Sequence, residues 1–306
     1  LSKYDPETIH YRAMDALTLA YCIPGVPFVL RSLFSVRDKR LERTVFGITF
    51  PNPVGLAAGF DKNGIWTDEL ETLGFGFVEI GTVTPKPQLG NDKSRLFRLK
   101  PDEAVINRMG FNNEGSVKAA QALSKRNSSL IIGGNIGKNK LTANEDAIKD
   151  YEICFEKLFT WVDYFVVNVS CPNVGNLTKL QEKEPLLQLM QKISAENKKQ
   201  TQPKPLLLKI APDLSEVELD DVIDIIKTLN LDGVVASNTS VDRSNLKTDK
   251  NYIEKIGYPG GLSGLPVKEK STKTIKYLYQ KLGDKHPIIA VGGIHSAEDA
   301  MEKLNA

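Results

Sequence analysis

Short apolar runs alternate with helical stretches along most of this 306-residue chain, and that alternation limits the fold more than any other feature. The runs are rich in Val and Ile and apolar on both faces, as is typical of parallel strands buried between helices. Seven strands are predicted, at Val54–Ala58, Phe77–Val83, Leu130–Asn135, Tyr164–Val169, Pro205–Ile210, Gly233–Ser237 and Ile288–Val291. Helices between them are predicted at Asn113–Ser124, Ala143–Phe159, Glu184–Asn197, Ser215–Leu229 and Lys268–Leu282.

This α/β pattern fits either a (β/α)8 TIM barrel or a doubly wound sheet. No G-x-G-x-x-G motif follows the first strand, which disfavours a dinucleotide-binding doubly wound sheet. No linker rich in Pro, Gly or Ser interrupts the series, so residues 41–306 are expected to form one barrel domain. The sequence ends within the helix expected after the seventh strand, so an eighth strand is expected beyond Ala306.

The composition excludes several classes of protein. With 41% hydrophobic and 25% charged residues, the chain is neither disordered nor fibrous. Its 40 basic and 38 acidic residues give a net charge of +2, which does not favour nucleic-acid binding. Three cysteines without a C-x-x-C pair predict neither a disulfide framework nor a metal site.

Two short helices are predicted ahead of the barrel, within residues 1–40. Asp5 is a helix N-cap followed by a proline at the first helical position, and this helix should end near Tyr21. A second helix, over Pro27–Phe34, carries one apolar face and is followed by a basic cluster. The pattern fits either a helical hairpin packed on the barrel or a helix lying in a membrane surface. No run reaches the ~18 apolar residues of a spanning helix, and early acidic residues disfavour a signal peptide.

Nearly every predicted strand ends in a cluster of polar residues or glycines. In a barrel these ends meet on one face, where catalytic groups lie. The clusters are Ala57–Lys62, Gly81-Thr82, Asn135–Asn139, Asn168–Asn173, Lys209–Asp213, Ser237–Thr239 and Gly292–Ile294. Turn chemistry alone does not explain so many, so an active site is expected at this face.

Several side chains near these ends suggest a chemistry. Amides suit a flat heterocycle that carries N–H and C=O groups, although each one alone is typical of a turn. They are Asn107, Asn112, Asn113, Asn135, Asn168, Asn173 and Asn238. Lys209 could face an anionic cofactor ring, form a Schiff base, or pair with an acid such as Asp213. Cys171 could be a base or a nucleophile if Lys62 or Lys209 favours its thiolate, whereas the other two cysteines are predicted to be buried and structural.

Glycines and histidines give weaker signals. Gly292-Gly293 and the glycines of Gly261–Gly264 could approach a phosphate, but each could also be a plain turn residue. His10, His286 and His295 are predicted to be structural or surface residues.

Together these motifs resemble the dihydroorotate dehydrogenase family over essentially the whole chain, from Asp5 to Ala306. The segments that carry the resemblance are Ala57–Asn63, Ile80–Pro85, Asn107–Asn113, Asn168–Asn173, Lys209–Leu214 and Gly260–Gly264. The resemblance implies an FMN-containing barrel that oxidises dihydroorotate to orotate in pyrimidine (UMP) biosynthesis. The N-terminal helices resemble the class 2 type, a peripheral membrane enzyme that reduces a quinone. The resemblance therefore favours a membrane-facing quinone tunnel at Pro27–Phe34 and a location on the cytoplasmic face of a bacterial inner membrane.

The resemblance also implies roles for individual residues. FMN would be held by Ala58, Gly59, Phe60, Asp61, Lys62, Thr82, Asn135, Asn168, Lys209, Ser237, Gly264 and Gly293. The substrate would be held by Lys62, Asn107, Arg108, Met109, Gly110, Phe111, Asn168, Asn173, Asn238 and Thr239. Lys209 would stabilise negative charge on the reduced flavin, and Lys62 would bind the orotate carboxylate. Cys171 would remove the C5 proton while hydride leaves C6, and Arg98 would line the quinone tunnel.

One departure from the class 2 pattern lies beside the base. Class 2 members usually carry serine and threonine where this chain has Cys171 and Val174, and the cysteine–valine pair resembles class 1. A free thiol ionises near pH ~8.5, far more readily than a hydroxyl, so we hypothesise that Cys171 does not need the threonine.

Other functions remain open from the sequence. The nearest are a class 1-type enzyme linked to fumarate or NAD and a related dihydropyrimidine dehydrogenase. A different class is a flavin-free barrel lyase with a Schiff base on Lys209. A third is an inactive barrel that only binds a ligand or partner.

Overall fold

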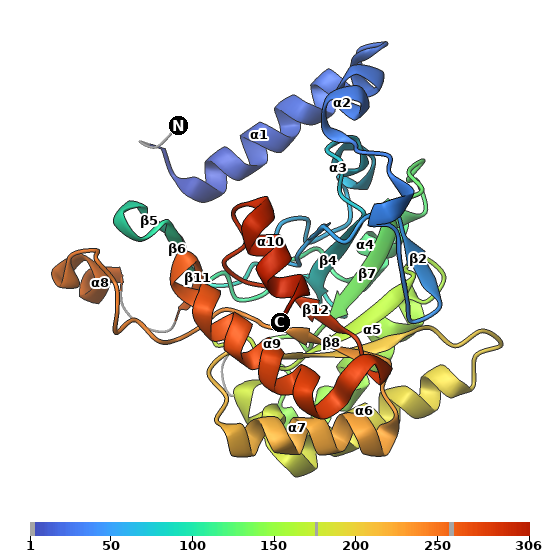
Figure 1. Cartoon of the computed structure of the whole chain (residues 1–306), viewed down its shortest axis with the longest axis vertical. Coiled ribbons are helices and arrows are strands. Elements are labelled where there is room, and N and C mark those ends of the chain that lie inside the picture. Colours follow the sequence, from blue (N-terminus) through green and yellow to red (C-terminus); the bar gives the residue numbers. More distant parts are fainter. Residues whose placement is uncertain (1–3, 175–176, 257–259) are drawn as a thin grey trace.

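The computed structural model describes residues 4–174, 177–256 and 260–306, and a curled parallel sheet lies at its centre (Figure 1). The strands are β3 (Gly55–Leu56), β4 (Phe77–Val83), β7 (Ile131–Ile136), β8 (Tyr164–Asn168), β9 (Leu206–Ile210), β10 (Gly233–Ala236) and β12 (Ile288–Ala290). These seven strands confirm the seven predicted ones, with β3 shorter than expected. Their spatial order, β3-β4-β7-β8-β9-β10-β12, follows the chain without reversal. A barrel has this order, whereas the order of a doubly wound sheet reverses.

Helices connect the strands and cover the outer side of the sheet (Figure 1). They are α3 (Thr67–Thr72), α4 (Ser116–Leu123), α5 (Ala147–Leu158), α6 (Lys183–Lys198), α7 (Glu216–Leu229) and α9 (Lys268–Leu282). Helix α8 (Lys250–Ile256) lies away from this sheet (Figure 1), and α10 (Ala297–Leu304) follows β12. The main core lies between the helices and the sheet, where strand side chains such as Val78, Ile132 and Leu208 are fully buried. Side chains alternate between the two faces of a strand, so the opposite face carries a smaller apolar cluster around Tyr164 and also the buried polar residues described below.

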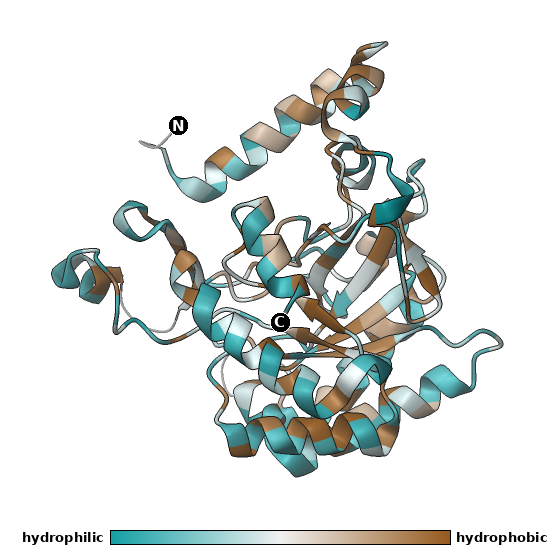
Figure 2. Cartoon of the chain, in the orientation of Figure 1, coloured by the Kyte–Doolittle hydropathy of each residue, from teal (hydrophilic) through white to brown (hydrophobic). Residues whose placement is uncertain are grey.

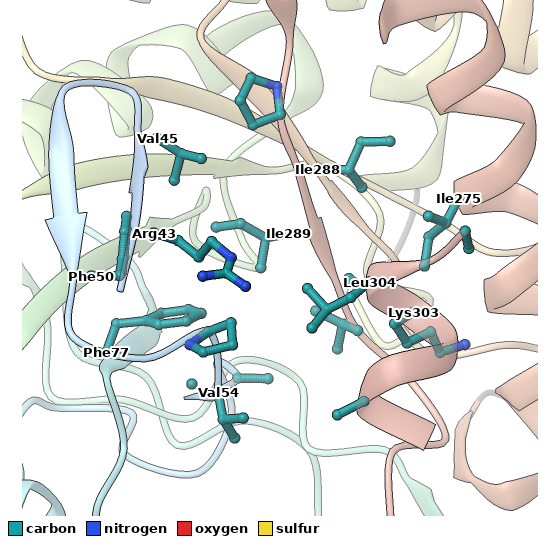
Figure 3. Close-up of a pocket in the computed structure, with 18 of the residues that line it drawn as sticks. Arg43, Val45, Phe50, Val54, Phe77, Ile275, Ile288, Ile289, Lys303 and Leu304 are labelled. Atoms are coloured by element: carbon teal, nitrogen blue, oxygen red, sulfur yellow. The ribbon is translucent and has the colours of Figure 1, made fainter. Parts of the chain in front are cut away.

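The strands β3 and β12 are the two edges of the sheet, and an apolar cavity of about 1300 Å³ lies between them. Figure 3 shows Phe77 on one side of this cavity and Ile288, Ile289 and Leu304 on the other. An eighth strand would pair with both edges at this place. The structure does not test the predicted eighth strand, which therefore stays a prediction.

Two small antiparallel sheets were not predicted. The strands β1 (Arg43–Val45) and β2 (Ile48–Phe50) form a hairpin ahead of the barrel. A three-stranded sheet pairs β5 (Leu96–Leu99) and β6 (Ala104–Asn107) with the distant β11 (Gly261–Gly264). This second sheet brings Asn107 opposite Gly261, so two of the motif segments meet.

The two predicted N-terminal helices are confirmed as α1 (Pro6–Tyr21) and α2 (Val26–Phe34). The Asp5 side chain caps α1 by accepting from the backbone N–H of Thr8 (2.8 Å). No single helix in the described part of the chain is long and apolar enough to span a membrane, although α1 and α2 together pass that test with a 116° bend between them. Cys154 is buried as predicted, but Cys22 is exposed, because it lies at the turn between α1 and α2 and not against the barrel.

Candidate active site

A buried network of hydrogen bonds links polar side chains at or just after the ends of β4, β7, β8 and β10. Thr82 Oγ1 donates to Asn135 Oδ1 (2.5 Å), and Asn168 Nδ2 donates to Thr82 Oγ1 (2.8 Å) and Asn135 Oδ1 (3.2 Å). After β10, Asn238 Nδ2 donates to Ser170 Oγ (2.9 Å) and Asn168 Oδ1 (3.3 Å). The barrel therefore brings these four predicted asparagine and threonine residues together through direct contacts.

Lys209 joins this network through Glu79, a residue of β4 that sequence reasoning missed. Lys209 Nζ donates to Glu79 Oε1 (3.0 Å), which also accepts from Asn135 Nδ2 (2.7 Å). Both charged side chains are almost fully buried, so the pair satisfies two charges held away from water. Of the alternatives predicted for Lys209, pairing with an acid is the one observed, but the acid is Glu79 and not Asp213, which pairs with a lysine of α9. The sequence did contain a signal for this pair: Glu79 stands in an apolar strand, and a buried carboxylate requires a partner.

Asn107 and Asn173 form a second pair of amides beside this network. Asn173 Nδ2 donates to Asn107 Oδ1 (3.0 Å) and to the Asn107 carbonyl (3.1 Å). Within the described ranges, Asn173 Oδ1 is buried without a hydrogen-bond partner. Such an orphaned acceptor costs free energy that a ligand N–H would recover. A pyrimidine ring carries suitable N–H donors.

Cys171 lies in the loop directly after β8 and is buried. Burial raises the pKa of its thiol to about 11, although the backbone N–H of Asn173 and the charge of Lys209 act in the opposite direction. Lys62 is also close enough for its charge and that of Cys171 to interact. Lys209 thus acts in the predicted direction, but desolvation has the larger effect on the thiol.

Asp61 and Lys62 follow β3 but have different surroundings. The Asp61 carboxylate is fully buried and accepts from the backbone N–H groups of Ile65 (3.1 Å) and Trp66 (2.9 Å). It therefore shapes the turn that carries Lys62. Lys62 keeps some exposed surface, yet the protein around it desolvates its ammonium group and lowers its pKa to about 8. A desolvated ammonium gains most from an anionic partner, so Lys62 suits a substrate carboxylate.

The loop after β6 is held in place by Arg108. Its guanidinium donates to the carbonyl oxygens of Ser94 (2.9 and 3.2 Å) and Ile256 (2.8 Å). The Arg108 side chain thus joins the loop before β5 to the end of α8, and its predicted contact with the substrate stays a prediction. The remaining predicted residues lie in the same set of loops, with Ala58 and Gly59 after β3, Met109, Gly110 and Phe111 after β6, and Ser237 and Thr239 after β10.

Helix α1 lies against this site. The His10 ring on α1 packs edge-on against Phe60 (4.6 Å between centroids) and Trp66 (5.2 Å). Burial lowers the pKa of His10, which fits the predicted structural role. Arg98 on β5 donates to the Tyr4 carbonyl (3.0 Å), so it lies beside the start of α1.

Two predicted phosphate glycines are required by the backbone. Gly264 and Gly293 have φ values of +102° and +68°. A Cβ would lie 2.4 Å from the Glu103 carbonyl oxygen at Gly264 and 2.6 Å from the Lys268 Cα at Gly293. Close packing therefore explains both glycines, and their contact with a phosphate stays a prediction.

The site is compatible with a flavin. The residues that line the 1300 Å³ cavity include Glu79, Gly264 and Gly293, and the volume is ample for an isoalloxazine ring and its chain. The rest of the cavity is the apolar space between the sheet edges (Figure 3). The buried Lys209 and the amides of Asn135 and Asn168 would hold the polar edge of such a ring, because they offer the donors and the positive charge that its N–C=O groups need.

Comparison with known proteins agrees with this geometry. Residues 40–306 match the family profile described as dihydroorotate dehydrogenase. A protein of Christiangramia forsetii named dihydroorotate dehydrogenase (quinone) is 55% identical over 307 residues, which is 100% of this chain and 88% of that protein. One of the same name from a Synechococcus species is 46% identical, covering 99% of this chain and 81% of that protein.

Solved structures give the same result. The ligand-free dihydroorotate dehydrogenase of Eimeria tenella superposes with a TM-score of 0.86 at 34% identity, over 98% of this chain and 86% of that one. The same enzyme in complex with ferulenol gives a TM-score of 0.85 at 35% identity, over 98% and 83%. The chain therefore belongs to the dihydroorotate dehydrogenase family.

Proposed function

We propose that this protein is a class 2 dihydroorotate dehydrogenase, which oxidises dihydroorotate to orotate for pyrimidine biosynthesis with FMN as cofactor and a quinone as electron acceptor. The observation that carries the proposal is the buried network in which Lys209, Glu79, Asn135 and Asn168 converge beside Cys171. The relatives from Christiangramia forsetii and Synechococcus, both named as quinone enzymes, support the choice of acceptor.

The side chains divide the chemistry among them. When bound, FMN supplies the acceptor for a hydride. Lys62 binds the substrate carboxylate, and the orphaned Asn173 Oδ1 accepts a ring N–H. Cys171 Sγ takes the C5 proton as hydride leaves C6, so its thiolate is the reactive form. Because burial raises the pKa of this thiol to about 11, the rate of flavin reduction rises with pH across the neutral range.

A flavin-bleaching experiment tests the assignment. Anaerobic addition of dihydroorotate should remove the visible absorbance of the bound flavin, and a soluble quinone analogue should restore it, whereas fumarate and NAD⁺ should not. Restoration by fumarate or NAD⁺ would indicate the class 1 alternative that Cys171 and Val174 leave open. Failure of dihydroorotate to bleach a flavin-loaded protein would leave the fold correct and the substrate wrong.

The Schiff-base lyase is the less favoured alternative. Schiff-base formation needs a neutral amine. Lys209 Nζ is instead bound to Glu79 Oε1 (3.0 Å) in a buried pair, so the amine is already engaged by a carboxylate. Borohydride trapping of a carbonyl substrate on Lys209 would be required to revive this alternative.

The proposed division of the chain places residues 1–40 in a membrane-associating segment and residues 41–306 in the FMN barrel. α2 has no buried residue, and its side chains Phe28 and Leu33 are 76% and 71% exposed. Figure 2 shows apolar residues gathered on α2 and the end of α1. We define the apolar tip as Leu19, Ile23, Phe28, Val29, Leu33, Phe34 and Val36, all exposed. With the basic residues that follow it, the tip fits the surface of a membrane that carries anionic lipids.

Loss of the apolar tip should uncouple membrane binding from substrate oxidation. The double variant Phe28→Asp/Leu33→Asp should bind vesicles containing anionic lipid about 100-fold more weakly or worse, because each side chain contributes about 1.5–3 kcal/mol when buried in lipid. Flavin reduction by dihydroorotate should stay unchanged. Co-sedimentation with vesicles and stopped-flow absorbance measure the two effects. Leu141→Asp, at a 96% exposed leucine outside the apolar tip, is the matched control, and equal loss of binding in that variant would contradict the proposal.

A further inference from the structure

Helix α1 carries one buried acid, Glu7, whose partner lies in the loop before β5. Glu7 is 3% exposed, and Met14 is the one other buried residue of α1. The Glu7 carboxylate accepts two hydrogen bonds from one guanidinium, from Arg95 Nε (2.9 Å) and from Arg95 Nη2 (2.6 Å). This parallel arrangement is the strongest geometry available to an arginine–carboxylate pair. The start of α1 lies beside β5 (Figure 1).

Arg95 uses its remaining nitrogen to fix its own loop. Arg95 Nη1 donates to the carbonyl oxygens of Leu89 (2.6 Å) and Asn91 (2.7 Å), so one side chain holds both α1 and the loop 89–95. Within the loop, Asn91 Nδ2 donates to the carbonyl oxygens of Asn173 (3.2 Å) and Arg108 (3.0 Å). Asn91 N also donates to the Met109 carbonyl (3.1 Å). The loop therefore supports both segments that are proposed to hold the substrate ring.

Glu7 also acts on the proposed carboxylate-binding lysine. The charged and titratable groups that act on Lys62 are Glu7 and His10 from α1, Arg95 from the loop before β5, and Cys171 after β8. Burial, helped by the charge of Arg95, lowers the pKa of Lys62 to about 8, although Glu7 and Cys171 favour the charged form. Removal of the Glu7 charge would thus lower the pKa of Lys62, because less negative charge would oppose the effect of Arg95.

We propose that Glu7 is a positioning residue of the dihydroorotate site, and that its pair with Arg95 couples the docking of helix α1 to the binding of substrate. This inference rests on the proposed function, because it concerns how the same site is held together. Coupling of this kind is reciprocal. Bound orotate must stabilise the docked position of α1 as much as the docked helix stabilises bound orotate.

The test compares Glu7→Gln with wild type in the flavin-loaded full chain. Orotate affinity is measured from its effect on the flavin spectrum between pH 6 and 9. In wild type, the Kd should rise above about pH 8, by about tenfold per pH unit, as Lys62 loses its proton. In Glu7→Gln the rise should begin at lower pH, and the Kd at pH 7 should be at least fivefold weaker. In steady-state assays KM for dihydroorotate should increase more than kcat falls, because Glu7 does not touch the reacting atoms.

Hydrogen exchange supplies a readout of the reciprocal effect. Orotate should slow amide exchange in the first turns of α1 in wild type and should do so much less in Glu7→Gln. The control is Asp15→Asn, which removes the same charge from an exposed position on the same helix and should leave the pH profile and the exchange unchanged.

Three outcomes separate the possibilities. An unchanged pH profile and unchanged exchange in a folded Glu7→Gln protein would overturn the inference. Absence of orotate binding by flavin-loaded wild type would instead overturn the proposed function. If Glu7→Gln does not fold, Glu7→Asp is measured in its place. It keeps the charge but is too short for both bonds to Arg95, so weaker orotate binding with an unchanged pH midpoint supports positioning, and full wild-type affinity contradicts it.

Discussion

Cys171→Ala should slow reduction of the bound flavin by dihydroorotate by about 10²–10⁴-fold, the usual contribution of a positioned general base. The variant should keep its FMN, because the buried network around Thr82, Asn135 and Asn168 does not include the thiol. In wild type the same rate constant should rise about tenfold per pH unit through the neutral range, because the thiolate is the base and burial raises the pKa of the thiol to about 11. Stopped-flow absorbance at a series of pH values measures both effects.

Serine at this position separates the role of the thiol from that of its neighbour. A serine hydroxyl is a far weaker acid than a thiol, so Cys171→Ser should also be slow, because Val174 offers no hydroxyl to relay a proton. Val174 is buried three residues from Cys171, and Val174→Thr would return a hydroxyl to that place. The double variant Cys171→Ser/Val174→Thr should therefore be faster than Cys171→Ser alone. Full activity of Cys171→Ser at neutral pH would show that the cysteine is not what makes valine tolerable here.

The barrel could be predicted from the sequence because its strands and helices have strong local patterns. The run Phe77–Val83 is bounded as predicted, and the capping box of Ser215 and Glu218 marks the start of α7. The sheet β5-β6-β11 could not be predicted, because its strands are short and β11 pairs with a segment far away in the chain. The pairing and register of such distant strands are set by tertiary packing and turn geometry, not by local sequence.

The site was only partly predictable, for a different reason. Polar clusters after each strand revealed where it lies, but burial decides what each group does. In the sequence, Glu7 is an acid in the first turn of a predicted helix, a position that acids favour. Only packing against the loop before β5 makes it a buried partner of Arg95. From the sequence, Cys171 is a thiol that nearby lysines could favour as thiolate. In the folded protein, desolvation has the larger effect on its pKa.

Lys209→Met should give the largest loss of stability of any substitution considered for this site. The methionine leaves the Glu79 carboxylate buried without its cation, and breaking a buried pair in this way costs about 3–5 kcal/mol. It also removes the positive charge proposed to stabilise the reduced flavin. Thermal or urea unfolding of the flavin-loaded protein measures the first effect. A redox titration measures the second, and the midpoint potential should become more negative by about 30–60 mV, which corresponds to a charged hydrogen bond of about 1.5–3 kcal/mol.

The double variant Lys209→Met/Glu79→Gln distinguishes these two effects. Glutamine keeps an acceptor for Asn135 Nδ2 but carries no charge, so the buried imbalance disappears and most of the lost stability should return. The midpoint potential should stay low, because no cation faces the flavin in either variant. If the double variant recovered the wild-type potential as well, the role of Lys209 would be structural, and the charge that stabilises the reduced flavin would have to come from another residue. If it recovered neither stability nor potential, Glu79 would be needed for more than its charge, through its contact with Asn135 at the centre of the network.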